Sequence, residues 1–294
     1  MPSYIIYSLI AATAFALSNL IIKFSSKHTI SNNWTLLVYL SLTSAPFILL
    51  VPLLFPVSIP TARAWPFVLL YGVVFLIGNV FFATAVYRLD ASTFAPFFQL
   101  QSAFIALLAY LFLSERFPPL QYIFIVLMLI GAVLVSLDER MRLKPFFRLA
   151  TILIIAQQFF HVLSNLSAGF ALQSINSFSF LFWGDMTTFL LTLLLVPFIG
   201  REQLRVRFEQ IKPLFLSGLF SVIGAMSLFS AFQTNVTVSS VLSLLTSPTV
   251  LGLSFLASTF KPDLLEHHPP RVYLVRAVGV GLILICVLRL SLWS

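Results

Sequence analysis

Apolar segments of about 20 residues recur along the whole chain, and they constrain its fold more than any other feature. Each is long enough for a helix to cross the roughly 30 Å hydrocarbon core of a bilayer. A segment in lipid must pair its own backbone polar groups, and these segments are too long and too uniformly apolar for the strands of a barrel. The sequence therefore predicts an all-α integral membrane protein.

Charged residues, prolines and turn residues between the apolar segments predict ten transmembrane helices with short connections. Only 9% of the residues are charged and 60% are hydrophobic, whereas soluble domains carry about 25% charged residues. No extramembrane domain is expected. The predicted helices cover residues 4–24, 34–55, 66–87, 92–113, 119–137, 148–171, 177–198, 212–233, 237–258 and 271–292.

The basic residues predict an orientation in the membrane. The formal net charge is +8, but Lys and Arg lie in short loops, so nucleic-acid binding is not expected. With ten helices, only Arg63, Arg116 and Arg289 lie on the side that holds both termini. Because Lys and Arg are retained in the cytoplasm, both termini are predicted to be non-cytoplasmic, in a multi-pass protein of the cell inner or plasma membrane.

The sequence predicts neither a metal site nor a cofactor. Its only cysteine, Cys286, lies inside the last apolar segment, which excludes a disulfide framework and a cysteine-rich metal site. No ATP-binding motif is present. The first apolar segment, residues 4–22, has no basic region before it, so we expect a retained helix and not a signal peptide.

An internal repeat divides the chain into two units. The tetrapeptide Leu-Ser-Asn-Leu occurs at residues 17–20 and again at 163–166, an offset of 146 (163 − 17). The predicted five-helix repeats are residues 1–139 and 148–294, joined by a basic cytoplasmic linker at 140–147. At the same offset Gly72, Ile77, Gly78 and Ala85 fall on Gly218, Ile223, Gly224 and Ala231.

Five is an odd number of helices, so the second unit must be inverted in the membrane relative to the first. Inverted repeats give two arrangements of similar energy, one open to each side, around a site near the bilayer midplane. The sequence therefore predicts two inverted five-helix repeats that work by alternating access.

The sequence resembles the EamA-like branch of the drug/metabolite transporter superfamily, over essentially the whole chain in two copies. The resemblance rests on Ala-Leu-Ser-Asn at 16–19 followed by Lys23, and on the stretch 85–131, with Leu-Ser-Glu-Arg at 113–116 followed by Gln121. It implies transport of small solutes such as amino acids, other metabolites, nucleotide sugars or cationic drugs, often by proton coupling or exchange. It does not select among these solutes.

Four features depart from that branch. The first helix lacks the frequent Trp-Gly pair, Gly169 stands where the first copy has Lys23, and the loop around Glu266 carries an insertion. The predicted non-cytoplasmic termini also differ from the orientation common in the branch. We expect Lys23 to snorkel at the cytoplasmic end of the first helix.

Polar side chains inside the helices are candidates for binding substrate, because they are costly in lipid and tend to face a cavity. Gln158, His161 and Asn165 share one stripe of the sixth helix, with Gln157 on its flank. The first helix offers the repeat-related Asn19.

Two further residues are candidates for proton coupling. Asp185 is the only acidic residue well inside a predicted helix. It is a protonation switch, a counter-charge for an amine, or a structural acid bonded to Thr187 or Thr188. His161 is a structural histidine, a cavity-lining group or a proton carrier, since its reference pKa is about 6.5.

Prolines predict helix breaks at matching places in the two repeats, and such breaks point to a transport site. In the fourth helix Gln99 and Gln101 follow Pro96, and Pro248 lies at the corresponding place in the ninth. The remaining substrate-binding candidates are Asn79, Trp183 and Gln233.

These features predict a secondary active transporter or exchanger for a small polar or amphipathic metabolite, such as an amino acid or related solute. We expect its cavity to be lined by the first, third, fourth, sixth, eighth and ninth helices. Its expected partners are membrane lipids and either protons or a counter-substrate, and it is a monomer or homodimer. A membrane-embedded enzyme, with His161 and Asp185 as base and acid, a channel and a lipid flippase are the alternatives. The enzyme is disfavoured because converging catalytic groups are lacking.

Overall fold

The computed structural model describes residues 3–89, 149–200, 202–234, 245–260 and 269–292, with single positions between 97 and 134 and between 239 and 243. Within these residues the chain is helical and contains no strand. The elements are α1 (Ser3–His28), α2 (Asn33–Leu54), α3 (Trp65–Val86), α7 (Leu149–Ala171), α8 (Ser177–Leu195), the 3₁₀-helix η2 (Val196–Phe198), α9 (Phe208–Phe232), α11 (Thr246–Phe260) and α12 (Pro270–Leu292).

Six helices in the described part of the chain are long and apolar enough to cross a membrane, namely α1, α2, α3, α7, α8 with η2, and α9. This confirms an all-helical chain with several apolar spans. Most of the predicted fourth and fifth helices lies outside the described residues, and the described positions of the fifth are helical. Two boundaries differ from the prediction, because α1 continues to His28 and α9 begins at Phe208.

The predicted ninth helix is interrupted. Ser239 and Ser243 are helical, Leu245 lies in a turn, and α11 begins at Thr246. Pro248 therefore lies in the first turn of α11, where the N–H that it lacks would have no partner within the helix. The proline marks the start of a helix here and not a kink within one.

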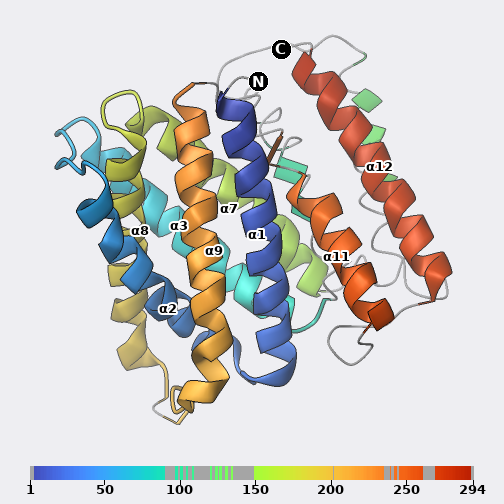
Figure 1. The fold of residues 1–294 in the computed structure, drawn as a ribbon, viewed down its shortest axis with the longest axis horizontal. Helices are drawn as coiled ribbons and strands as arrows, with labels where there is room; N and C mark the ends of the chain where they lie inside the picture. The colour runs from blue at the N-terminus through green and yellow to red at the C-terminus, as the bar shows by residue number, and fades with distance from the viewer. Residues whose placement is uncertain are drawn as a thin grey trace.

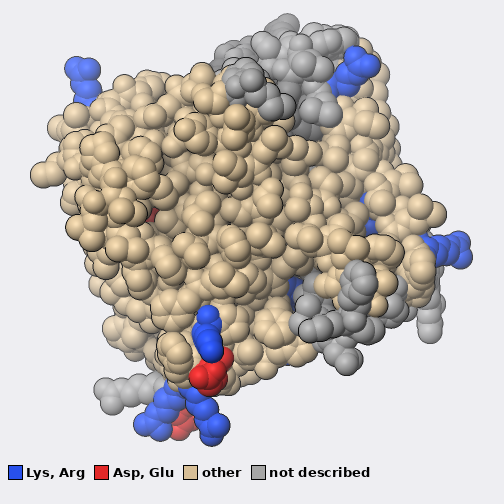
Figure 2. Space-filling view, in the orientation of Figure 1, with Lys and Arg blue, Asp and Glu red and all other residues tan. Residues whose placement is uncertain are grey.

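The outer surface of the bundle is apolar. Leu53, Leu54 and Leu194 are 78%, 71% and 66% exposed, as expected for side chains that face lipid. Most of the face in Figure 2 is uncharged, and one group of charged side chains lies at its lower edge, by the loop between α8 and α9. The exposed charged residues of this region are Glu202, Arg205, Arg207, Glu209 and Lys212.

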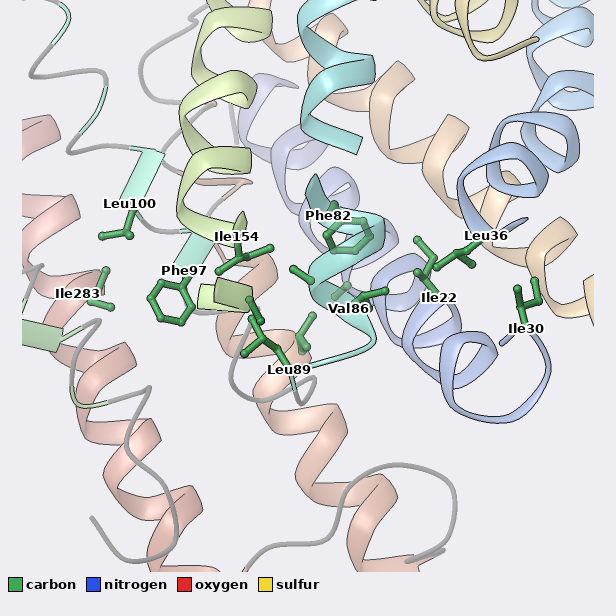
Figure 3. Packing of buried hydrophobic residues seen from close by; sticks show 14 of the residues in the cluster. Ile22, Ile30, Leu36, Phe82, Val86, Leu89, Phe97, Leu100, Ile154 and Ile283 are labelled. Atoms are coloured by element: carbon green, nitrogen blue, oxygen red, sulfur yellow. The ribbon is translucent and has the colours of Figure 1, made fainter. Parts of the chain in front are cut away.

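A hydrophobic cluster packs the end of the bundle where α1 and α3 finish. Its members come from α1, α2, α3, α7, α9, α11 and α12, and also include residues near position 97 (Figure 3). Lys23 lies at this end but is only 4% exposed, and its Nζ donates to the Val86 carbonyl at 2.8 Å. The expected snorkelling is therefore wrong. The ammonium group satisfies a carbonyl at the C-terminus of α3, where the helix dipole favours a cation.

Helices from the two halves of the chain, residues 1–139 and 148–294, pack against one another in opposite directions. Phe15 and Ser18 of α1 lie against Gly224 and Ser221 of α9, so these two helices are antiparallel. The pair α3 and α7 is also antiparallel, since Phe67 lies against Phe170 and Phe81 against Phe160. Figure 1 shows α1 and α9 side by side, with α2 and α8 on one flank and α11 and α12 on the other.

Contacts between the halves occur in matching pairs. A Cβ on Gly78 would lie 3.3 Å from the His161 ring, and one on Gly224 would lie 2.8 Å from the Phe15 ring. Gly224 lies 146 residues after Gly78 (224 − 78), and His161 lies 146 residues after Phe15 (161 − 15). The two contacts therefore correspond at the offset of the repeat.

Two aromatic side chains at corresponding positions each donate a hydrogen bond to a loop of the other half. The Tyr39 hydroxyl of α2 donates to the Leu204 carbonyl at 2.9 Å, and the Trp183 indole N–H of α8 donates to the Ser58 carbonyl at 3.0 Å. Asn32 and Asn176 cap the helices that carry them, which aligns α2 with α8 at an offset of 144 (176 − 32). Tyr39 and Trp183 correspond at this offset.

Candidate functional site

A cavity of about 270 Å³ lies inside the bundle, between the two halves. Residues from α1, α2, α3, α7, α8, α9 and α11 line it, together with Phe98, Gln101 and Ser243. The second and seventh helices were not among those expected to line it, although Asp185 and Trp183 of the seventh were candidates. Ser41 and Ser44 of α2 and Thr188 and Phe189 of α8 line the wall.

Seven of the residues predicted from the sequence line this cavity. The Ser-Asn pairs of the two repeats meet in it, as Ser18 and Asn19 come from α1 and Ser164 and Asn165 from α7. Residues that correspond in the predicted repeat thus line the same cavity. The predicted residues that line the cavity are Asn19, Asn79, Gln101, Gln157, His161, Asn165 and Asp185.

Four predicted residues do not line it. Gln158 is fully buried behind the wall. Trp183 is bonded to the Ser58 carbonyl, and Gln233 is exposed at the C-terminal end of α9. Gln99 lies outside the described residues.

Asp185 is held by a neighbouring helix. The Tyr71 hydroxyl of α3 donates to its Oδ1 at 3.2 Å. The alternative partners predicted for the acid, Thr187 and Thr188, instead donate to the Trp183 and Gly184 carbonyls of their own helix. The carboxylate therefore links α8 to α3 and also lies on the cavity wall.

Gly184 explains how Tyr71 reaches this acid. A Cβ on Gly184 would lie 2.9 Å from the Tyr71 ring, so a larger residue would displace the ring. The sequence analysis did not identify Tyr71. The available signal was a phenol within an otherwise apolar helix, because a buried hydroxyl requires a partner.

His161 lies on the wall formed by α3 and α7. Its ring stacks on Phe75, with 5.3 Å between the centroids, and Gly78 leaves room for it. The Nε2 atom is buried and has no hydrogen-bond partner among the described residues. A buried ring nitrogen without a partner is costly, so a group bound in the cavity is a suitable partner for it.

A chain of amides forms another part of the wall. The Gln101 Nε2 donates to the Gln158 Oε1 at 2.9 Å, and the Gln158 amide donates to Gln157. Gln158 thus supports the two glutamines that line the cavity. Amides both donate and accept hydrogen bonds, so this region suits a polar, uncharged portion of a solute.

The wall formed by α1 and α9 carries hydroxyls in addition to the Asn19 amide. Ser18 shares hydrogen bonds of 2.8 Å with both Ser217 and Ser221 across α1 and α9. The Thr246 hydroxyl, at the start of α11, lies within hydrogen-bonding distance of the Ala12 and Ser243 carbonyls. The helix interruption near Pro248 therefore contacts α1 beside the cavity.

The described part of the chain contains no group of three or more His, Cys, Asp or Glu side chains that could hold a metal ion. The cavity wall in this part includes no Lys or Arg and a single acid, Asp185. What the wall offers is hydrogen bonding, aromatic contact and one carboxylate.

The profile of the EamA-like transporter family matches residues 2–137. This part of the chain belongs to that family. EamA-like proteins are part of the drug/metabolite transporter superfamily and are membrane transporters of small solutes, not enzymes. Together with the six apolar helices, the match supports an integral, multi-pass membrane protein.

A crystal structure of another protein is similar to this chain over nearly its whole length. Its TM-score is 0.64 at 14% sequence identity, and the alignment covers 97% of each chain. At that identity the similarity shows the fold alone. A search of the curated proteins finds no matching relative.

Proposed function

We propose that the protein is a secondary active transporter or exchanger that moves a small polar or amphipathic metabolite across the membrane by alternating access. The observation that carries the proposal is the cavity between the halves, with the repeated Ser-Asn pairs of α1 and α7 on its walls. A site near the middle of two repeats is the arrangement that alternating access requires.

We further propose that residues 1–139 and 148–294 are two inverted five-helix repeats joined by the linker 140–147, in a bundle of ten helices. The antiparallel directions of α1 and α9, and of α3 and α7, support an inverted relation. The matched contacts of Gly78 with His161 and of Gly224 with Phe15 support a pseudo-two-fold axis between the halves.

The cavity wall favours a solute that is not strongly anionic, because no Lys or Arg of the described residues lines it. Amino acids and related metabolites are the first solutes to test. The amides of Gln101 and Gln157 and the Nε2 of His161 offer hydrogen bonds to such a solute.

The experiment that tests this function is counterflow in proteoliposomes. Purified protein is reconstituted in vesicles loaded with unlabelled amino acids, and uptake of the labelled solute is followed. We expect uptake above that of empty vesicles, reduced by Asn19→Ala and Asn165→Ala. Gln233→Ala, which changes an exposed residue outside the cavity, is the matched control. Uptake equal to that of empty vesicles for every solute class would contradict the proposal.

Coupling is assigned to His161 and Asp185, with protons or a counter-substrate as the driving partner. If protons drive transport, Asp185→Asn or His161→Ala changes the pH dependence of uptake. If neither variant changes uptake or its pH dependence, the proposed coupling role is wrong and simple exchange through the cavity remains.

We also propose that both termini are non-cytoplasmic. The exposed Arg205, Arg207 and Lys212 at the end of the bundle where α9 begins would then lie in the cytoplasm. A cysteine at Glu202, introduced with Cys286→Ala, tests the orientation with a membrane-impermeant thiol reagent. Labelling in intact cells would contradict it, and labelling only after permeabilisation is expected.

A further inference from the structure

We infer that Asp185 and the aromatic rings beside it form a subsite for the charged nitrogen of an organic monocation, an ammonium group with alkyl substituents. The inference rests on the proposed transport function, because it names the substrate class of that cavity. It concerns the region between α3, α8 and α9.

The carboxylate is available to a ligand. Asp185 lines the cavity and is only partly buried. Its Oδ1 accepts from Tyr71, and no other hydrogen bond to the carboxylate occurs among the described residues. Thr187 and Thr188 use their hydroxyls within α8. The acid is therefore oriented by Tyr71 and is not saturated by other groups in the described part.

Aromatic rings surround this acid. Tyr71 and Phe75 stack on α3 with centroids 5.2 Å apart, and Phe229 of α9 meets Tyr71 edge-on at 6.1 Å. Phe189 lies one turn along α8 from Asp185 and also lines the cavity. Ring faces attract alkylated ammonium groups through cation–π contacts, and the attraction is stronger away from water.

The charge balance favours a cation over a zwitterion or a neutral solute. An unpaired carboxylate within a membrane is costly, and no Lys or Arg of the described residues lines this cavity. A bound ammonium group would supply the missing counter-charge. A carboxylate on the solute would meet amides, hydroxyls and the His161 ring, and no Lys or Arg, on the described walls.

The subsite belongs to one half only. At the offset of 144, Asp185 corresponds to Ser41 of α2 (185 − 144), and at 146 Tyr71 corresponds to Ser217 of α9 (71 + 146). Both serines are small and uncharged. The repeat thus supplies two similar walls, and only the wall at α3 and α8 carries the acid and its phenol partner.

The test uses three probes of nearly the same shape on the purified full chain. These are choline, its uncharged isostere 3,3-dimethylbutan-1-ol, and the zwitterion glycine betaine. Titrations by thermal shift are expected to show choline binding at least about tenfold more tightly than the other two. Equal affinity for choline and its neutral isostere would overturn the inference, whatever the variants do.

Variants then assign the site to its residues. Asp185→Asn keeps the shape of the side chain and an acceptor for Tyr71, so we expect it to weaken choline binding about tenfold or more and to leave the neutral isostere unchanged. Asp185→Glu restores part of the preference. Phe75→Leu weakens choline, whereas Phe170→Leu, at an exposed position of α7, does not. Full choline affinity in folded Asp185→Asn would overturn the inference.

Counterflow separates this inference from the transport proposal. Uptake of amino acids that is unaffected by Asp185→Asn, with no uptake of choline, would disprove the cation subsite and leave the transporter intact. Binding of choline that depends on Asp185, without counterflow of any solute, would support the subsite and disprove transport.

Discussion

Helices α3 and α9 occupy corresponding places in the two proposed repeats, but they contact their neighbours through different side chains. Helix α3 faces α7 and α8 with Tyr71 and Phe75, which contact Asp185 and His161. Helix α9 presents Ser217 at the place of Tyr71 and Ser221 at that of Phe75. At these corresponding positions α3 therefore carries aromatic rings, whereas α9 carries hydroxyls.

This difference concentrates the recognition groups on one side of the cavity. The α3 side supplies an acid, a phenol and an imidazole. The α1 and α9 side supplies Asn19, aromatic rings and hydroxyls that bond to one another. In the proposed alternating-access cycle, the shared packing would allow the two halves to exchange arrangements. The unlike side chains would hold one solute in one orientation.

The largest expected effect concerns the close approach of α9 to α2. A Cβ at Gly218 would lie 2.8 Å from the Thr43 carbonyl oxygen and 2.9 Å from the Ser44 Cα, both of them backbone atoms. We expect Gly218→Ala to destabilise the fold by about 1–3 kcal/mol, because helices must separate. Thermal melting in detergent measures this.

The corresponding change in α3 sharpens the comparison. In Gly72→Ala the new Cβ would lie 2.5 Å from the Cγ2 and 2.9 Å from the Cβ of Thr187. That Cβ moves only with the backbone of α8, so we expect a loss of similar size. Gly169→Ala meets nothing within 4 Å and is the control. Equal melting temperatures for Gly218→Ala and Gly169→Ala would contradict the described packing.

A second pair of glycines tests the two walls of the cavity. The new Cβ of Gly224→Ala would approach the Phe15 ring to 2.8 Å and push it toward the cavity that it lines. We expect reduced counterflow with a folded protein. Gly78→Ala approaches His161 only to 3.3 Å, so its effect should be smaller. A larger loss of counterflow for Gly78→Ala than for Gly224→Ala would show that the packing is tighter on the α3 side.

The aromatic hydrogen bonds to the loops are expected to contribute equally. Tyr39→Phe and Trp183→Phe each remove one hydrogen bond to a backbone carbonyl, which costs about 0.5–1.5 kcal/mol. For Trp183 the smaller ring adds a packing loss. Denaturation of both variants gives the two values. No loss for either would mean that the loops are not fixed to α2 and α8.

The smallest effect is expected in the serine cluster. Ser221→Ala leaves Ser18 bonded to Ser217, so no buried hydroxyl of this cluster loses every partner. The cost should be below about 1 kcal/mol. A melting temperature close to that of the unchanged protein checks this, and a large loss would show that the α1 and α9 contact depends on the network.

The sequence allowed the apolar helices and the main lining residues to be predicted, because both follow from local rules. Polar groups such as Asn19, Asn165 and His161 are costly in lipid and so pointed inward. Gln233 and Trp183 were assigned to the cavity because their place on a helix face was unknown. Gln233 lies at a helix end, and the Trp183 indole reaches a loop of the other half.

What could not be predicted depends on contacts between distant parts of the chain. Thr187 and Thr188 were the nearest partners of Asp185 in sequence, yet the partner is Tyr71, 114 residues away. The depth of Lys23 follows from α1 continuing past it to His28 and from the nearby end of α3. Neither follows from hydropathy alone.

The most direct test of alternating movement between the halves is a pair of reversible cross-links in a Cys286→Ala background. Gly78→Cys with Phe160→Cys joins α3 to α7, where the two Cβ atoms would lie 3.5 Å apart, within the range for a disulfide. Ser18→Cys with Ser221→Cys joins α1 to α9, where the hydroxyl oxygens are 2.8 Å apart. We predict that oxidation of either pair stops counterflow and that reduction restores it. Full transport by the oxidised, cross-linked protein would contradict movement of the halves around this cavity.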